Sequence, residues 1–411
     1  MNQKTIFYLS SLLIFIFFGC SSNNRQDRDN LPFIDVRKNY PEKEIILTDI
    51  ADISYVHLCS TDDDYLFTVM MIDYFITNNT IVVYDVSSSS ILFFSKDGKP
   101  KSRFNRLGQG PQEYFNLSSF FYDEERDDVF VRSRGERHLQ VYSSKGEYKR
   151  KINLPLQKQF KVNSMISAKQ VITYRSFISF DDQTFLMFTD ISPATEIERK
   201  EYYIPPYTSF YHISKKDGSV LDSFYLFNKD VDLVEYEPGS RSYAFTSYKR
   251  AVKSIDGFYL YNPETDTVFF YSKEKILTPV FHKTPLVSDL DPKVIINNNI
   301  LDSYKYHFFS IEKIAYSTKL SPNPPQYFFH DKETNEIFRQ KITLPDYLGK
   351  EFKITGRHAN EEDGSGFHVV LTLIELKQAY NENRLSGKLK ELVATLDELE
   401  DNDVLMLAKF K

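Results

Sequence analysis

The sequence lacks the residues on which several classes of protein depend. It has no Trp and only 2 Cys among its 411 residues, so it cannot form the disulfide framework of a small secreted scaffold. Basic residues are not in excess, because the formal net charge is −6, and they form no stripe with interleaved aromatic residues. A mildly acidic chain has no electrostatic reason to bind nucleic acid, so we expect no nucleic-acid partner.

Local motifs for catalysis and metal binding are also missing. The 8 His are scattered, and no two lie at metal-ligand spacing on one local element. No H-E-x-x-H, G-x-S-x-G or Cys–His arrangement occurs. Two acidic clusters, Thr61–Tyr65 and Asn360–Gly366, could offer oxygen atoms to calcium, but neither has the spacing of an EF-hand loop. We interpret both as solvated turns and expect no cofactor, with calcium as the alternative.

The N-terminal residues indicate export. The apolar run from Ile6 to Phe18 is too short for a membrane-spanning helix, so residues 1–19 are predicted to be a signal peptide. Gly19 and Cys20, which follow, resemble the lipobox of bacterial lipoproteins. This resemblance implies that Cys20 carries lipid and forms the mature N-terminus. Ordinary secretory cleavage nearby is the alternative.

A polar segment follows the predicted lipidation site. Ser21–Asn30 is uncharged overall and poor in apolar residues, which is typical of a flexible tether. We therefore expect a tether at residues 20–40 and one folded domain at residues 41–411. With lipid on Cys20, Cys59 has no partner within the chain, and we expect it to be packed as a small hydrophobic residue in a strand.

A recurring hairpin pattern predicts an all-β fold. The 35 Phe and 28 Tyr favour strands, and five segments each contain an apolar strand, a short turn with Lys, Asp or Gly, and a second strand. The turn centres lie about 50 to 70 residues apart, which fits one four-stranded β-propeller blade per repeat. The five hairpins are Ile91–Phe104, Leu139–Leu154, Phe210–Leu226, Thr267–Phe281 and Gln326–Leu344.

Another strand precedes each hairpin, and the chain ends supply a sixth blade. The preceding strands are predicted at Thr80–Asp85, Asp128–Ser133, Gln183–Thr189, Asp256–Asn262 and Lys313–Leu320. The sixth blade is predicted from Glu44–Ile50, Ile53–Leu58, His368–Leu376 and Asp403–Lys411. Pairing the first and last strands would remove exposed sheet edges. Helical spacing predicts one helical insertion in this blade, at Leu385, Leu389, Leu392 and Leu396.

One segment recurs between consecutive blades. Its clearest copy is RLGQGPQEYFNL, Arg106–Leu117, and further copies are KQFKVNSMI at residues 158–166 and KEFKITGRH at residues 350–358. A nucleotide-binding Gly-rich loop would have to run into a helix, whereas this one runs into a predicted strand. The segment is therefore interpreted as a structural joint and not as a phosphate cradle.

The residues of this joint have distinct expected roles. Gly108 and Gly110 should allow close backbone approach, Pro111 should stiffen the path, and Tyr114 should fill the space between two blades. The aromatic position of Tyr114 is taken in the other copies by Phe160 and Phe352.

The joint and the hairpin after it carry a family resemblance. RLGQGPQEYFNLSSFFYD resembles the six-bladed β-propeller lipoproteins of Bacteroidetes, which are related to NHL-repeat propellers. Gly108, Gly110, Tyr114 and Asp123 match the Gly-rich turn, the aromatic residue and the strand-final Asp of the NHL pattern. The resemblance implies a six-bladed propeller anchored in the cell envelope, at the outer membrane or facing the periplasm. It implies no reaction, because members of this group mostly lack an assigned biochemical function.

The joints and inner strand ends would meet at one mouth of a central channel, where we expect a ligand to bind. The residues predicted to line this mouth are Arg103, Arg106, Gln109, Glu113, Arg132, Arg134 and Arg357. A guanidinium group can bind a carboxylate through two parallel hydrogen bonds. Such a mouth would therefore suit acidic sugars or a peptide C-terminus. The alternative is that these arginines tie adjacent blades through salt bridges. A catalytic base at Glu113 is a weaker hypothesis, since the other copies have Gln159 and Glu351 there.

The predicted architecture is compatible with two functions. The first is a non-enzymatic binding or scaffold module, held to the membrane by lipid on Cys20, with a glycan, a peptide or an envelope protein as partner. The alternative is a lyase or hydrolase that acts on an acidic polysaccharide or peptide at the channel mouth. Fold analogy alone supports the alternative, and a fold does not determine function.

Overall fold

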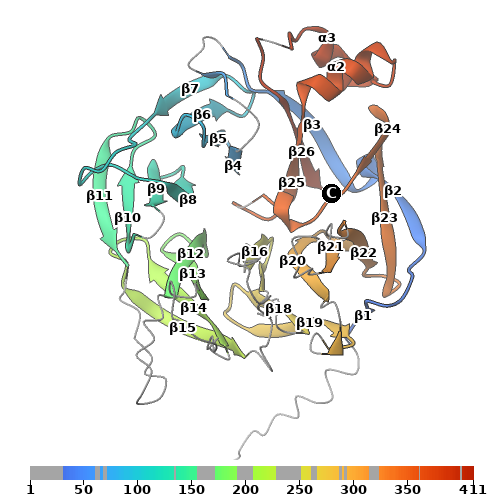
Figure 1. Cartoon of the computed structure of the whole chain (residues 1–411), viewed down its shortest axis with the longest axis horizontal. Helices are drawn as coiled ribbons and strands as arrows, with labels where there is room; N and C mark the ends of the chain where they lie inside the picture. The colour runs from blue at the N-terminus through green and yellow to red at the C-terminus, as the bar shows by residue number, and fades with distance from the viewer. Residues whose placement is uncertain are drawn as a thin grey trace, which may run out of the picture.

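The chain forms a six-bladed β-propeller, as predicted from the sequence (Figure 1). The computed structural model describes residues 31–60, 65–67, 72–133, 136–154, 172–191, 207–227, 251–260, 266–286, 289–290, 294–313, 324–360, 362–398 and 400–411. The predicted signal peptide and Cys20 lie outside these residues. Within them, no helix is both long enough and apolar enough to cross a membrane.

Five blades are antiparallel meanders of four consecutive strands. The first contains β4 (Ile72–Ile76), β5 (Thr80–Asp85), β6 (Ser90–Ser95) and β7 (Pro100–Phe104), and the second β8 (Leu117–Asp123), β9 (Asp128–Ser133), β10 (His138–Tyr142) and β11 (Tyr148–Asn153). The third contains β12 (Ile172–Ser179), β13 (Thr184–Ile191), β14 (Tyr207–Ser214) and β15 (Val220–Phe227). The fourth contains β16 (Ala251–Ser254), β17 (Gly257–Leu260), β18 (Thr267–Ser272) and β19 (Leu277–Thr284), and the fifth β20 (Val294–Asp302), β21 (Tyr306–Lys313), β22 (Gln326–Asp331) and β23 (Glu336–Leu344).

These blades confirm all five predicted hairpins. In Figure 1 the first strand of each blade lies nearest the centre of the ring and the fourth lies outermost. One preceding strand was predicted in the wrong place: the second strand of the fifth blade is β21, Tyr306–Lys313, and not Lys313–Leu320. Residues 314–320 lie outside the described part of the chain.

The chain ends close the ring. β25 (Gly366–Leu371), β26 (Val404–Phe410) and β3 (Ala51–His57) form the sixth sheet in that order, and β26 pairs with β3 along its whole length. Closure by the two ends is thus confirmed, but the segment Glu44–Ile50 does not join this sheet. The predicted strand His368–Leu376 ends at Leu371, because helix α2 (Leu373–Asn381) begins there. The helical insertion contains a second short helix, α3 (Gly387–Ala394).

The N-terminal residues wrap the outside of the ring before they enter the closing blade. β1 (Phe33–Asp35) pairs in parallel with β19, and β2 (Glu42–Ile46) pairs in parallel with β23. The short helix α1 (Leu47–Ile50) then leads into β3, while β24 (Tyr347–Phe352) and the 3-10 helix η5 (Gly356–His358) lead into β25. The folded part therefore begins near Phe33, inside the segment predicted to be a tether.

Aromatic side chains fill the wedges between neighbouring blades. Phe75 of the first blade meets Phe121 of the second edge-on, with ring centroids 5.1 Å apart. Phe121 in turn meets Phe185 of the third blade at 5.3 Å and 83°. Edge-to-face rings lock one blade against the next in a preferred geometry. These contacts between blades account for part of the high Phe and Tyr content of the sequence.

We predict that Leu405→Ala loosens the closure of the ring. Leu405 on β26 is 1% exposed and packs in the hydrophobic cluster shared with the first blade. Its truncation should lower the free energy of unfolding by about 2 to 5 kcal/mol, measured by urea denaturation. Leu348→Ala, at a position 57% exposed, is the matched control and should change it by less than about 0.5 kcal/mol. Equal losses in the two variants would show that this contact is unimportant for closure.

Candidate functional site

The joint between the first and second blades is a compact loop closed by Glu113. The N–H of Gly110 donates to Glu113 Oε2 at 2.8 Å, and the N–H of Tyr114 donates to the Arg106 carbonyl at 2.9 Å. A Cβ on Gly108 would lie 1.9 Å from Glu113 Oε2, so a larger residue there would displace this carboxylate from its present position. The Glu113 carboxylate is therefore used within its own loop.

Tyr114 lies between two blades. Its side chain is fully buried, its hydroxyl donates to the Ser89 carbonyl at 2.6 Å, and its ring meets Tyr142 edge-on at 6.2 Å. Phe352, its counterpart in the last joint, is also buried, whereas Phe160 lies outside the described residues.

The rest of the loop lies against the second blade. Gln140 Nε2 donates to the Pro111 carbonyl at 3.4 Å, and Arg106 Nε donates to the Gly146 carbonyl at 2.9 Å. Gln109 is exposed. Arg106 thus connects the joint to a turn of the next blade through a hydrogen bond to backbone.

The other predicted arginines are on different strands. Arg103 is exposed on β7, the outermost strand of its blade, whereas Arg132 is buried on β9 with Nη1 3.1 Å from the Ser118 hydroxyl. Burial lowers the pKa of Arg132 to about 10. Arg134 and the side chain of Arg357 lie outside the described residues. The described arginines lie on different elements, and their carboxylate-binding role remains a prediction.

A lysine recurs directly after the third strand of four blades. In each case its backbone N–H donates to a carbonyl in the turn between the first and second strands, at 2.8 to 3.2 Å. Because the strands alternate in direction, these two turns lie at the same end of a blade. The repeated hydrogen bond therefore gathers basic residues at one end of the ring. The four are Lys96, Lys215, Lys273 and Lys332.

Buried Lys215 and half-buried Lys253 converge on Ser179, at the end of β12. The ammonium of Lys215 donates to the Ser179 hydroxyl at 2.8 Å. The ammonium of Lys253, on β16 of the next blade, donates to the Ser179 carbonyl at 3.3 Å. The ammonium of Lys215 also lies 3.9 Å from Asp123 Oδ2, whereas the ammonium of Lys253 makes no other hydrogen bond within the described chain.

The loop before β25 brings a carboxylate to these lysines. Figure 1 shows this loop extending from the closing blade into the middle of the ring. A Cβ on Gly364 would lie 2.4 Å from the Ser254 backbone, so the loop packs directly on the fourth blade. Glu362 Oε2 is buried and has no hydrogen-bond partner among the described residues. We define the ring-centre cluster as Lys96, Glu124, Lys215, Lys253 and Glu362.

Burial and like charges perturb the ionisable groups of the ring-centre cluster. Burial, followed by repulsion from Lys215, lowers the pKa of Lys253 to about 8. Burial, followed by the carboxylates of Glu124 and Asp363, raises the pKa of Glu362 to about 7, although two lysines oppose this shift. Groups that titrate near neutral pH because of burial and specific charged neighbours are typical of functional sites.

The described part of the acidic loop Asn360–Gly366 forms no metal site. Among the described residues, no group of three or more His, Cys, Asp or Glu side chains is placed to hold a metal ion. Asp363 accepts hydrogen bonds from the N–H and the hydroxyl of Ser365, at 2.9 and 2.6 Å, and so stabilises its own turn. The other acidic cluster, residues 61–64, lies outside the described residues.

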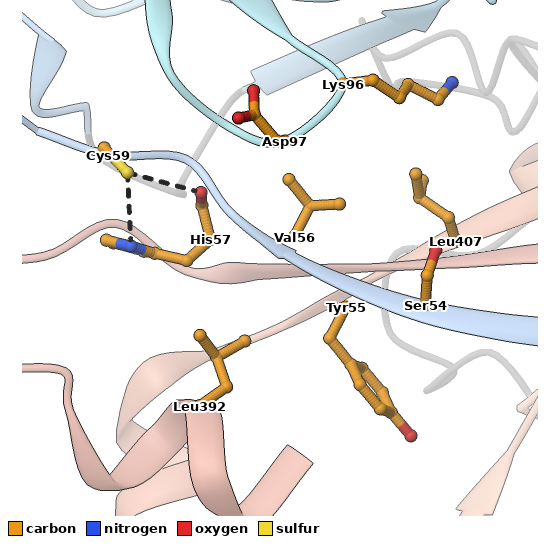
Figure 2. Close-up of a pocket in the computed structure, with 9 residues that line it drawn as sticks. All are labelled: Ser54, Tyr55, Val56, His57, Cys59, Lys96, Asp97, Leu392 and Leu407. Atoms are coloured by element: carbon orange, nitrogen blue, oxygen red, sulfur yellow. Dashed lines mark hydrogen bonds between the residues drawn. The ribbon is translucent and has the colours of Figure 1, made fainter. Parts of the chain in front are cut away.

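A cavity of about 470 Å³ lies beside β3. Figure 2 shows β3 crossing it between the β6–β7 turn, which supplies Asp97, and helix α3, which supplies Leu392. Half-buried Cys59 has its Sγ 3.8 Å from His57 Nδ1, and His57 Nε2 lies 3.2 Å from Asp401 Oδ1. Two sequence interpretations are thereby corrected: Cys59 lines a cavity, and a Cys–His arrangement exists.

The surroundings of Cys59 keep its thiol protonated. Burial and the carboxylates of Asp401 and Asp97 raise the pKa of the thiol. Burial lowers the pKa of His57, although Asp401 opposes this shift. Because the thiolate is the reactive species, a protonated thiol beside a neutral imidazole is a weak nucleophile at neutral pH. The charges around Cys59 therefore do not favour nucleophilic catalysis.

Comparison with known proteins identifies the family. Residues 31–409 match a family described as a domain of unknown function, DUF4934. The chain belongs to the DUF4934 family. No match occurs among curated proteins.

One solved structure supports the fold of this DUF4934 protein. A candidate exported protein from Bacteroides fragilis has a TM-score of 0.58 at 17% identity, over 90% of this chain and 98% of that chain. A member of the duf4221 family from Bacteroides vulgatus is 14% identical over 88% of this chain and 97% of that chain, with a TM-score of 0.43, which is too low to support an argument.

Sequence reasoning missed the ring-centre cluster, although part of its signal is local. Four predicted hairpins have Ser-Lys or Asp-Lys where the first strand ends and the turn begins. When these hairpins are aligned, Lys96 and Lys215 occupy equivalent positions. Lysines in turns are usually solvated, so the pattern suggests nothing unusual. Lys253 and Glu362 have no local signal, because their proximity depends on how distant blades meet.

We predict that Glu362→Gln makes stability less dependent on pH. The folded-state pKa of about 7 lies above the ordinary 4.5, so the wild type loses stability as pH rises through this interval and the carboxyl group ionises. The variant, which never ionises, should equal the wild type near pH 4.5 and exceed it by about 1 to 3 kcal/mol at pH 7.5. Denaturant unfolding at both pH values measures this difference.

Glu398→Gln is the control for this experiment, because Glu398 is exposed in the loop after α3. The free energy of unfolding of this variant should change between the two pH values by the same amount as that of the wild type. The free energy of unfolding of Glu362→Gln could instead differ from that of the wild type by the same amount at both pH values. That result would contradict the assignment of a raised pKa to this carboxyl group.

Proposed function

We propose that this DUF4934 protein is a non-enzymatic binding module of the bacterial cell envelope that holds a carboxylate ligand at the ring-centre cluster. The lipobox-like Gly19 and Cys20 support export and a lipid anchor on Cys20. The description of the Bacteroides fragilis structure as a candidate exported protein supports the same location. A propeller held in this way presents a rigid ring to solutes of the envelope.

The convergence of Lys215 and Lys253 on Ser179 carries this proposal. Two ammonium groups bonded to one residue repel each other, and burial removes the water that would screen them. Lys215 has Asp123 as a counter-ion 3.9 Å away. The ammonium of Lys253 has a single hydrogen bond, 3.3 Å long, within the described chain, and the carboxylates of Glu362 and Asp363 act on it without forming an ion pair there. A ligand carboxylate on Lys253 relieves both the repulsion and the cost of burial.

Glu362 favours an acidic sugar as the ligand. Its buried Oε2 accepts no hydrogen bond from the described residues, and a buried polar atom without a partner costs free energy. A uronic acid has a carboxylate for Lys253 and hydroxyl groups that can donate to Glu362. A simple carboxylate satisfies only the lysine. Acidic glycans therefore fit this cluster better than other carboxylate ligands.

We predict that Lys253→Met weakens binding of trigalacturonate by at least about tenfold, because it removes one charge-assisted hydrogen bond. Isothermal titration calorimetry at pH 7 measures the dissociation constant. Wild-type affinity should also fall between pH 7 and pH 9, since the lysine with a pKa of about 8 loses its proton in this interval. Binding of the methyl-esterified sugar should be weak at every pH.

Lys216→Met is the matched control, because Lys216 is an exposed neighbour in the β14–β15 turn and should leave affinity unchanged. Equal affinity of wild type and Lys253→Met, or of the acid and its ester, would contradict the proposal. Release of an unsaturated sugar product during incubation would instead favour the alternative function, a lyase, with Lys253 as the proton acceptor.

A further inference from the structure

We infer that the outer edge of β3 is a second binding site, which takes an extended segment of a partner polypeptide by strand addition. The closing sheet contains three strands among the described residues, whereas each of the other five sheets contains four or more. No described strand pairs with the edge of β3 that faces away from β26. An unpaired edge of this kind is a template for another strand. This inference does not rest on the ring-centre cluster, although Lys96 of that cluster also lines the cavity beside β3.

The register shows which backbone groups point to the open edge. The N–H of Lys411 donates to the Ile50 carbonyl at 3.1 Å, one step beyond the last pair of the β26–β3 ladder. In an antiparallel ladder, every second residue bonds to the same neighbouring strand. The residues that face β26 are therefore Asp52, Ser54 and Val56, and those that face outward are Ile53, Tyr55 and His57. The outward N–H of Cys59, which donates to Gly98 at 2.9 Å, agrees with this alternation.

The open edge has two walls and one closed end. Figure 2 shows the β6–β7 turn on one side of β3 and helix α3 on the other. Gly98 closes the end near His57, because a Cβ at Gly98 would lie 1.9 Å from the His57 carbonyl oxygen. Ser54 is exposed and lines the cavity of about 470 Å³. The stretch from Ile53 to His57 gives room for about four or five residues of an extended partner.

The charges at the closed end select a basic partner. Asp97 and Glu400 are exposed there, and the Ser60 hydroxyl donates to the Glu400 carbonyl at 2.5 Å, which places the loop after α3 beside the end of β3. Asp401 contacts His57 at 3.2 Å. Lys99 pairs with Asp97 at 2.7 Å and offsets part of this charge. Lys96 also lines the cavity, but its ammonium donates to the Thr77 carbonyl at 2.6 Å. An acidic rim attracts lysine or arginine side chains of the incoming strand.

The test uses the full chain and a fluorescein-labelled, end-capped peptide, Lys-Thr-Val-Thr-Val-Lys, with a matched peptide in which Glu replaces Lys. Fluorescence anisotropy should show saturable binding of the basic peptide and at least tenfold weaker binding of the acidic one. Ser54→Trp, which fills the cavity, should weaken binding of the basic peptide at least tenfold. Hydrogen exchange should slow in the segment Ala51–Leu58, because the outward N–H groups become bonded.

Asp52→Trp is the matched control, since Asp52 is exposed on the same strand but outside the cavity, and it should leave affinity unchanged. Glu400→Lys should weaken binding of the basic peptide and strengthen binding of the acidic peptide. Equal binding to Ser54→Trp and Asp52→Trp, or equal binding of the two peptides, would overturn the proposal. So would concentration-dependent dimerisation that Ser54→Trp abolishes, because the occupant would then be a second copy of the chain.

Discussion

The pairing of β26 with β3 is the contact on which the rest of the structure depends. It joins residues from the two ends of the chain, from Ala51 with Phe410 to His57 with Val404. Closing so long a loop has an entropic cost, which the continuous ladder and the apolar clusters on both faces of the closing blade offset. Without this ladder the first and fifth blades would each expose an aromatic face.

Closure also determines where the charged groups lie. The loop that carries Glu362 precedes β25, so it reaches the fourth blade only when the ring is closed. Its carboxylate then lies near enough to Lys253 for the two charges to shift each other's pKa, while β3 becomes the outermost described strand of a three-stranded sheet. Both proposed binding sites therefore depend on ring closure. Closure gathers charged side chains at the centre, and it leaves the closing blade with an edge that no described strand pairs with.

Much of the fold could be predicted because blade signals are local. Alternating apolar residues and turn residues predict the strands Thr80–Asp85 and Asp128–Ser133 with the bounds that the structure has. Prediction failed where the apolar pattern continues across a change of structure. The apolar pattern predicts one strand over His368–Leu376, whereas α2 begins at Leu373. The pattern continues across this boundary because β25 and α2 both contribute apolar residues to the same core.

The sequence by itself determined the blade repeat, the closure by the chain ends and the structural character of the joint around Tyr114. Only the tertiary structure decided which ionisable groups meet. Lys215 and Lys253 share Ser179 because neighbouring blades bring their strand ends together, and His57 lies beside Asp401 because β3 ends next to the loop after α3. Strand patterns depend on neighbours a few residues away, whereas these charged contacts depend on residues brought together by folding.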